Sequence, residues 1–189
     1  MRTVKRPAFI AAPLLVLVYG VVRIIDGFDG VKGPGPAWTT GHLAFMGALA
    51  LFVAIFGQMR EMIGPRARVT ALIATLGALA LFGQFSVDVV AGFLAGDHAE
   101  MAAISQDVRS LPGVSLAFYD LGPYLFYIGQ LVLVVQLALH RHARVWTPVL
   151  VLADLAMPFV DKDLIPLGAV LLLVSFLPLA RTTRAPALV

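Results

Sequence analysis

The chain has 189 residues, of which 60% are hydrophobic and 13% charged, and its formal net charge is +3. Soluble domains carry about 45–50% apolar and about 25% charged residues, so this composition excludes a soluble enzyme or nucleic-acid-binding module. The lack of cysteine excludes disulfides, thiolate metal sites and cysteine nucleophiles. The length is that of one domain, and residues 1–189 are expected to form a single integral membrane domain.

Six apolar runs are candidates for membrane-spanning helices, because crossing the hydrocarbon core takes about 20 helical residues. They cover residues 8–25, 38–57, 69–95, 115–139, 146–160 and 164–180. The last two are short and are separated only by Asp161-Lys162-Asp163, which indicates a tight hairpin. The first run lacks a small-residue cleavage motif and is expected to be a retained helix. The predicted fold is therefore an all-α, polytopic bundle of six transmembrane helices in three hairpins.

Charge alternates between the segments that connect these runs. Ten of the 14 basic residues fall in alternate segments that hold one acid, Glu61: Arg2, Lys5, Arg6, Arg60, Arg66, Arg68, Arg141, Arg144, Arg181 and Arg184. The other connections hold Asp26, Asp29, Asp97, Glu100, Asp107, Asp161 and Asp163 against Lys32, Arg109 and Lys162. The positive-inside rule then predicts a multi-pass cell-membrane protein with both termini in the cytoplasm. Nucleic-acid binding is not needed to explain the basic residues.

Two of the predicted outer connections have distinct compositions. Residues 26–36 contain four glycines and two prolines and must be irregular. Residues 96–114 mix charged and apolar side chains, which favours a short amphipathic helix on the outer surface. Within the spans, small residues recur where helix backbones could approach closely. They are Gly47, Ala50, Ala54 and Gly57 on the second run, and Ala74, Gly77, Ala80 and Gly83 on the third.

Asp154 is the ionisable residue placed deepest in a predicted span, about nine residues from the inner end of the fifth run. Charged groups are costly in hydrocarbon, so an acid there is a candidate for function and should face the bundle interior. Pro158 lacks an N–H and leaves the Asp154 carbonyl without its helical donor. A carboxyl and a free carbonyl at one depth would suit a proton or a cation. The alternative is a protonated Asp154 that only bonds to a neighbouring helix.

Other polar residues fall within or at the edges of the runs. Gln84 and Asp88 are four residues apart and share a helix face, and Gln130 lies deep in the fourth run. Asp120, Tyr124 and Tyr127 fall on roughly one face, although a helix-terminal acid and an interfacial tyrosine belt would explain them equally. Arg23 and Asp26 are expected to form a local ion pair, with Asp88 or Asp154 as other partners for Arg23. His42 is expected near the outer surface.

No cofactor or metal is expected. His42 lies near the predicted outer face, whereas His140 and His142 lie at the inner end of the fourth run, so they cannot share one haem. His42 and His98 could meet outside the membrane, but no ligand spacing supports a metal there. The sequence also lacks a phosphate-binding glycine motif, a His-Glu-x-x-His motif and a serine hydrolase elbow.

The polar candidates lie mostly between mid-membrane and the outer surface, and together they would line an outward-opening pocket. The candidates for binding substrate or a proton are Arg23, Asp26, His42, Gln84, Asp88, Tyr124, Tyr127, Gln130 and Asp154. This arrangement favours a small membrane transporter or a substrate-binding membrane subunit, proton-coupled through Asp154 or Asp88. The ligand would be a small molecule or ion, cationic or polar and uncharged. Six helices with an outward site in about 190 residues resemble the substrate-capture subunits of energy-coupling-factor vitamin transporters.

Two other classes of function fit the same sequence. An integral membrane enzyme could use a protonated Asp154 or Asp88 as general acid on a lipid or isoprenoid substrate. Alternatively, the chain could be an accessory subunit of a larger complex, in contact with the lipid bilayer and a membrane protein partner. Product formation without a gradient would indicate the enzyme, and a stoichiometric partner would indicate the subunit.

Overall fold

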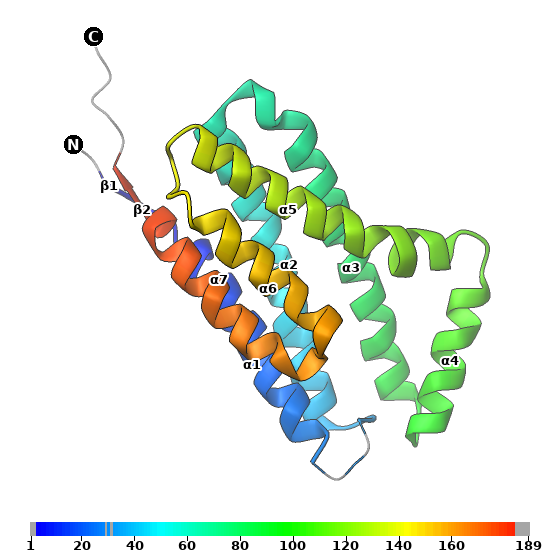
Figure 1. The fold of residues 1–189 in the computed structure, drawn as a ribbon. Coiled ribbons are helices and arrows are strands. Elements are labelled where there is room, and N and C mark those ends of the chain that lie inside the picture. Colours follow the sequence, from blue (N-terminus) through cyan, green and yellow to red (C-terminus); the bar gives the residue numbers. More distant parts are fainter. Residues whose placement is uncertain (1–2, 29, 31, 184–189) are drawn as a thin grey trace.

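The fold is a helical bundle, seen in a computed structural model that describes residues 3–28, 30 and 32–183 (Figure 1). Arg2, Asp29 and Arg184, which belong to the predicted charge pattern of the connecting segments, lie outside the described residues. Its helices are α1 (Ala8–Asp26), α2 (Pro36–Ile63), α3 (Arg68–Leu94), α4 (His98–Ser110), α5 (Gly122–Leu139), α6 (Thr147–Val160) and α7 (Ile165–Ala180). Short helical turns precede α3 (η1, Pro65–Ala67) and α7 (η3, Lys162–Leu164), and a π-helix precedes α5 (η2, Ser115–Leu121).

Five helical segments are long and apolar enough to cross a membrane. They are Ala8–Asp26, Pro36–Ile63, Pro65–Leu94, Ser115–Leu139 and Lys162–Ala180. The predicted fifth run forms α6, which has only 14 residues. At 1.5 Å per residue α6 is about 21 Å long, less than the hydrocarbon core of about 30 Å. The α6–α7 hairpin is therefore shorter than the hairpins around it.

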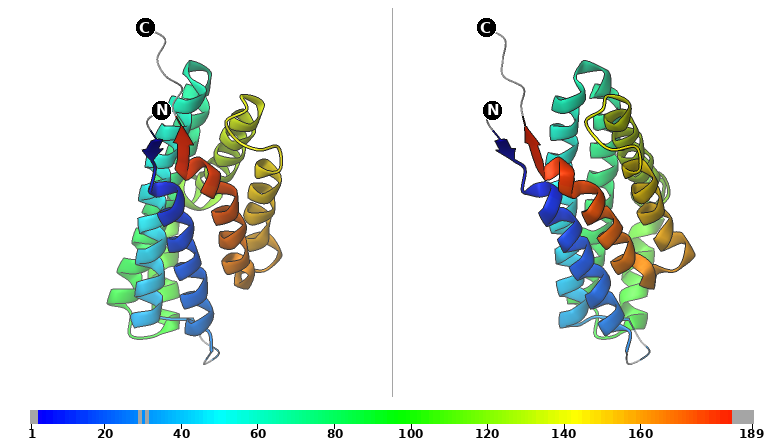
Figure 2. Two further views of the ribbon diagram at one scale, coloured as in Figure 1. Left: turned by 90° about the vertical axis from the view of Figure 1, so that its left-hand side faces the viewer. Right: turned by 60° about the vertical axis from the view of Figure 1, so that its left-hand side comes forward.

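The two chain ends meet at one end of the bundle. Strand β1 (Thr3–Lys5) pairs antiparallel with β2 (Arg181–Thr183), and the Arg6 amide donates to the Ala180 carbonyl at 3.1 Å. The α2–α3 and α5–α6 connections lie at this same end, called here the terminal end (Figures 1 and 2). The opposite end, called the α4 end, holds α4, the α1–α2 loop and the α6–α7 turn (Figure 1).

The charge pattern read from the sequence reappears in space. At the terminal end lie the basic residues Lys5, Arg6, Arg60, Arg66, Arg68, Arg141, Arg144 and Arg181. The other basic residues that the structure describes, Arg23, Lys32, Arg109 and Lys162, belong to segments toward the α4 end. As predicted, residues 98–110 of the second polar connection form a helix, α4.

Small residues bring α3 and α5 into direct backbone contact, as predicted for the third run. A Cβ added to Gly77 would lie 2.1 Å from the amide nitrogen of Phe126, and one added to Gly129 would lie 2.7 Å from the Cα of Ala74. Ala80 faces Gly122 in the same contact. Because these helices touch through backbone atoms, larger side chains could not be accommodated at this crossing.

The corresponding prediction for the second run holds only at Gly47, where an added Cβ would lie 3.3 Å from Leu15 Cδ1 of α1. Ala50, Ala54 and Gly57 are exposed, and a Cβ added to Gly57 would meet nothing within 4 Å. The opposite face of α2 packs inward through large side chains, among them Phe52 and Phe56. Small-residue spacing marks a helix face but does not decide whether that face meets a neighbour, because burying larger apolar side chains gives more contact area.

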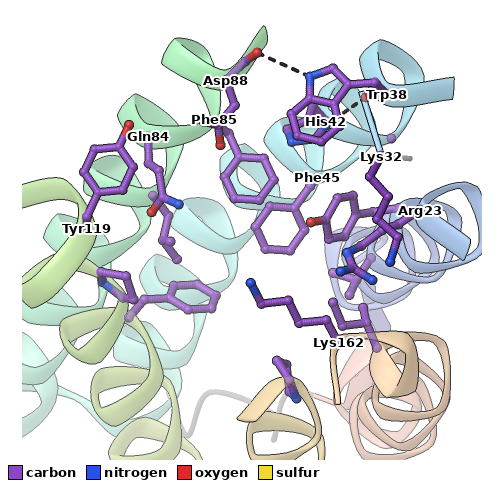
Figure 3. A pocket seen from close by; sticks show the side chains of 18 of the residues that line it. Arg23, Lys32, Trp38, His42, Phe45, Gln84, Phe85, Asp88, Tyr119 and Lys162 are labelled. Atoms are coloured by element: carbon purple, nitrogen blue, oxygen red, sulfur yellow. Dashed lines mark hydrogen bonds between the residues drawn. The ribbon is translucent and has the colours of Figure 1, made fainter. Parts of the chain in front are cut away.

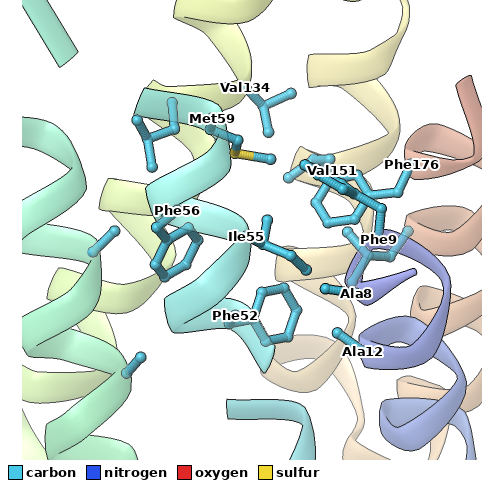
Figure 4. Packing of buried hydrophobic residues seen from close by; sticks show 14 of the residues in the cluster. Ala8, Phe9, Ala12, Phe52, Ile55, Phe56, Met59, Val134, Val151 and Phe176 are labelled. Atoms are coloured by element: carbon cyan, nitrogen blue, oxygen red, sulfur yellow. The ribbon is translucent and has the colours of Figure 1, made fainter. Parts of the chain in front are cut away.

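The apolar core fills the terminal half of the bundle. Phe9 of α1 meets Phe176 of α7 edge to face at 5.4 Å, and Ile55, Met59 and Val151 are fully buried beside them (Figure 4). Edge-to-face rings of this kind add stabilisation to that from apolar burial. This packing joins α1, α2, α5, α6 and α7 at the terminal end and leaves the polar side chains of the other half to line a cavity.

Candidate functional site

A cavity of about 680 Å³ occupies the half of the bundle toward the α4 end (Figure 3). Its volume is within the range of cavities that hold drug-sized ligands. Every helix from α1 to α7 contributes lining residues. The deepest part is bounded by Phe52, Leu81, Phe126, Leu155 and Leu172, which also border the apolar core. The walls become more polar toward the α4 end.

One wall is an aromatic cluster formed by Tyr19, Trp38, His42, Phe45 and Phe85 of α1, α2 and α3. Ring centroids lie 3.9 Å apart for Trp38 and His42, 4.5 Å for Phe45 and Phe85, and 4.9 Å for Tyr19 and Phe45. His42 Nδ1 donates to the Trp38 carbonyl at 2.8 Å, and Trp38 Nε1 donates to the Asp88 carbonyl at 3.3 Å. The rings brace one another and make a largely apolar wall.

The inner part of the cavity contains a buried amide. Gln130 of α5 has no exposed surface, and neither its Oε1 nor its Nε2 has a hydrogen-bond partner in the described part of the chain. Leaving a buried polar atom without a partner costs about 1–3 kcal/mol, so such groups are rare and call for an explanation. Gln130 lines the cavity, and its amide is therefore available to hydrogen-bond a polar group bound there.

Asp154 of α6 is 91% buried and lines the same cavity. Helix α7 approaches it at Gly168, where an added Cβ would lie 2.7 Å from Asp154 Oδ1 and 3.2 Å from its carbonyl oxygen. Tyr127 of α5 lines the same cavity. Asp154 thus lies between Gly168 of its own hairpin and a cavity that α5 also lines.

The outer part of the cavity is shaped by the π-helix η2. Its Tyr119 packs under Arg109 of α4, with the guanidinium carbon 4.1 Å from the ring centroid, a cation–π contact. Arg109 also interacts electrostatically with Asp88, and both residues line the cavity. The Gln84 Oε1 is buried without a hydrogen-bond partner among the described residues. π-Helical turns are rare and often occur at functional sites.

The rim at the α4 end is held by charged side chains from distant parts of the sequence. Arg23 Nη1 of α1 pairs with Asp163 Oδ1 of η3, and Lys32 Nζ from the α1–α2 loop reaches the same oxygen at 3.2 Å. His98 Nδ1, at the start of α4, donates to the Lys32 carbonyl at 2.6 Å. These contacts join α1, α4, η3 and the first loop around the cavity mouth.

The structure brings together eight of the nine side chains predicted from the sequence. The cavity is lined by Arg23, Asp26, His42, Gln84, Asp88, Tyr127, Gln130 and Asp154. The exception is Tyr124, which is 54% exposed and does not line it. Asp120 is also exposed. Within α5, the cavity-lining residues Pro123, Phe126, Tyr127 and Gln130 form one helical stripe, and Tyr124 falls beside it. The predicted common face of Asp120, Tyr124 and Tyr127 is therefore wrong.

Sequence reasoning missed several residues of the site. Tyr19 is not among the predicted site residues, because one tyrosine in an apolar run is an ordinary core residue, yet it lines the cavity and its ring packs against His42 and Phe85. Lys32, Arg109 and Lys162 were assigned to outer loops. A signal existed for Arg109, since His98, Met101, Ala102, Ser105, Gln106 and Arg109 follow a helical spacing and all line the cavity.

No protein-family model, curated protein or solved structure matches this chain. Among the described residues, no three His, Asp or Glu side chains are placed to hold a metal ion together. The site is therefore interpreted from its own geometry: an apolar cavity with a few convergent polar groups, open toward one end of a bundle of apolar helices.

Proposed function

We propose that this protein is a small membrane transporter, or the substrate-binding subunit of one, whose cavity opens to the outside at the α4 end. The observation that carries the proposal is the cavity itself, which extends from that end to the buried amide of Gln130, an amide without a hydrogen-bond partner among the described residues. Cavities that bind small molecules combine apolar walls with a few placed polar groups, as this one does.

Six membrane crossings with both termini in the cytoplasm belong to this proposal. Pairing of β1 with β2 places both chain ends at one end of the bundle, and this requires an even number of crossings. The five long apolar segments and the shorter α6 supply six. The concentration of arginine at the terminal end favours its cytoplasmic location. The cavity would then open on the opposite, outer side of the cell membrane.

Asp154 is proposed as the group that couples binding to a proton, with Asp88 as the second candidate. Both carboxyls line the cavity, where a ligand could reach them. Acids within membrane proteins commonly form proton relays in transporters. Tyr127 lines the same cavity, and its hydroxyl could hydrogen-bond the ligand as the proton moves.

Replacing Asp154 with asparagine is expected to abolish uptake while the protein stays folded, because the amide keeps the shape of the carboxyl but cannot exchange a proton. Proteoliposomes would be incubated with a cell extract under an imposed pH gradient, and accumulated compounds would be identified by mass spectrometry. We expect at least one compound to accumulate with the wild-type protein and at least about tenfold less with Asp154→Asn.

The matched control is Asp120→Asn, since Asp120 is an exposed acid that does not line the cavity. This variant should accumulate the compound as the wild type does. Equal accumulation by Asp154→Asn and wild type would contradict the role of Asp154, and accumulation by none of the proteins would contradict transport. A new compound formed in detergent, without a gradient, would instead indicate the membrane enzyme acting on a lipophilic substrate.

A further inference from the structure

At the α4 end, the basic side chains line the cavity, whereas most of the acidic side chains do not. All four basic residues of this end, Arg23, Lys32, Arg109 and Lys162, line the cavity. Most acids of the same end do not: Asp97, Glu100, Asp107, Asp120, Asp161 and Asp163 are absent from its lining. Asp26 and Asp88 are the acids that line the outer part. The mouth therefore concentrates positive charge, although this end of the molecule is rich in acids.

On helix α4, the order of residues places basic and uncharged side chains, but no acidic ones, in the cavity lining. Its cavity-lining residues begin with His98 and end with Arg109 and include no acid. Its acids serve elsewhere: Asp97 caps the helix by accepting from the Glu100 amide at 2.9 Å, and Glu100 Oε2 accepts from the Gly96 amide at 2.8 Å. Arg109 therefore reaches the cavity with no carboxylate of α4 on the same face, and the acid that interacts with it is Asp88 of α3.

Lys162 reaches the cavity because the α6–α7 hairpin is short. The turn between these helices is recessed relative to the α1–α2 loop (Figure 1), and the Lys162 amine points into the cavity (Figure 3). Within the part of the chain that the structure describes, Lys162 forms no ion pair. A cation directed into a cavity without a protein partner is available to an anion that binds there.

Arg23 and Lys32 share one carboxylate, that of Asp163, which lies on the rim just outside the cavity lining. This acid is half exposed and bridges α1, the first loop and η3. One carboxylate cannot neutralise two cations, and an anion entering the mouth would compete with Asp163 for both. Asp163 therefore acts as an internal counterion that lowers the affinity of the mouth for other anions.

We propose that the cavity takes an amphiphilic anion: a single carboxylate, sulfate or phosphate group on an apolar body. The anionic group would lie among Lys162, Arg23, Lys32 and Arg109, and the body would lie against the aromatic cluster and above Gln130. This inference rests on the proposed function, since it names the class of ligand for the same cavity. It replaces the cationic or uncharged ligand expected from the acids in the sequence.

The test compares probes that share one body and differ in charge: octyl sulfate, octanol and octyltrimethylammonium. The chain has two tryptophans, and Trp38 lines the cavity while Trp146 lies at the start of α6 at the terminal end. In a Trp146→Phe background, Trp38 fluorescence reports occupancy. The protein would be held in phosphatidylcholine nanodiscs, and titrations of a Trp38→Phe, Trp146→Phe variant would give the part of the signal that does not come from Trp38.

We expect octyl sulfate to bind at least about tenfold more tightly than octyltrimethylammonium, with octanol between them. Lys162→Gln should weaken octyl sulfate about tenfold, the effect of losing one charged contact worth about 1.4 kcal/mol. Arg66→Gln, which removes an exposed charge at the terminal end, should leave the affinity unchanged. If phosphatidylglycerol in the nanodisc competes with octyl sulfate, the anion is supplied by a bilayer lipid rather than by a soluble amphiphile.

Asp163→Asn distinguishes a role of Arg23 and Lys32 in binding the anion from a role in holding the fold together. It frees Arg23 and Lys32 for the ligand, so octyl sulfate should bind several-fold more tightly, whereas a purely structural ion pair would give weaker binding when broken. Asp161→Asn removes an acid two residues away that caps the Asp163 amide, and it should change affinity much less. Preference for octyltrimethylammonium, or weaker binding in Asp163→Asn, would overturn the anion proposal. Binding of none of the three probes would count against the ligand cavity and the proposed function.

Discussion

Replacing Gly77 with alanine is expected to lower the free energy of unfolding by about 3 kcal/mol, at the upper end of the usual cost of overpacking. The added Cβ would lie 2.1 Å from the Phe126 amide nitrogen and 2.7 Å from the Leu125 carbonyl carbon. These are backbone atoms, so no side-chain rotation relieves the overlap, and α3 and α5 must separate. Because η2 and α5 carry Tyr119, Tyr127 and Gln130, the separation would also distort the cavity.

Gly57→Ala is the matched control for this prediction. Gly57 lies in the exposed stripe of α2, where an added Cβ meets nothing within 4 Å. Alanine favours a helix interior over glycine by about 1 kcal/mol, so this variant should be unchanged or slightly more stable. Reversible unfolding in detergent micelles would compare the two variants with wild type. If both variants shift the free energy of unfolding in the same direction, α3 and α5 are not in backbone contact at Gly77.

The second large effect is expected at Gln130, where stability and binding should change in opposite directions. Gln130→Met keeps the length of the side chain and removes an amide that is fully buried without a partner in the described structure. The free energy of unfolding should rise by about 1–2 kcal/mol as the unsatisfied groups disappear. Affinity for a cavity ligand such as octyl sulfate should fall, because the hydrogen-bonding group nearest the apolar floor is lost.

Gln136 provides the comparison for Gln130. It lies on the same helix, and its Nε2 donates to Thr70 Oγ1 at 3.3 Å. Gln136 does not line the cavity. The Gln136 Oε1 is buried without a partner among the described residues, so Gln136→Met removes one unsatisfied atom but also loses a hydrogen bond. It should gain less stability than Gln130→Met and leave ligand affinity unchanged. Thermal unfolding and Trp38 titration of both variants would decide the matter. A large loss of stability in Gln130→Met would mean that Gln130 is a structural residue.

Much of the helical arrangement could be predicted from the sequence, because apolar length and charge sorting act locally. Runs of about 20 apolar residues became the long helices, and the basic segments came together at the terminal end. Gln84 and Asp88 share a helix face through their spacing alone, and both line the cavity. The prediction that they share a cavity with Asp154 rested on one assumption: polar side chains in membrane-spanning helices turn toward the bundle interior, because exposing them to lipid costs free energy.

The remaining features depend on geometry that local patterns do not carry. Tyr124 lies beside the α5 stripe of Pro123, Phe126, Tyr127 and Gln130 that lines the cavity, and the apolar sequence of α5 does not show which stripe faces inward. Lys162 enters the cavity because α6 and α7 are shorter than their neighbours, so that their turn is recessed. Most of the α2 stripe of small residues lacks a partner because the large side chains of the opposite face pack inward. Each case is a consequence of how the helices fit together.

We propose that a polar cavity opens to the cell exterior at the α4 end. Labelling of single cysteine substitutions shows which positions water reaches from that side. The natural chain has no cysteine, so each substitution is the sole reactive site. Intact cells would carry Ser105→Cys at the mouth, Gln84→Cys within the cavity, Leu79→Cys on an exposed apolar face, or Arg66→Cys at the terminal end. A membrane-impermeant thiosulfonate would be the reagent, since it reacts with a thiolate exposed to water.

We expect Ser105→Cys and Gln84→Cys to react in intact cells and Leu79→Cys not to react. Arg66→Cys should react only after the membrane is permeabilised. Octyl sulfate should slow the reaction at Gln84→Cys and leave that at Arg66→Cys unchanged. Labelling of Arg66→Cys in intact cells, or a Gln84→Cys that reacts only after permeabilisation, would contradict the outward-opening cavity.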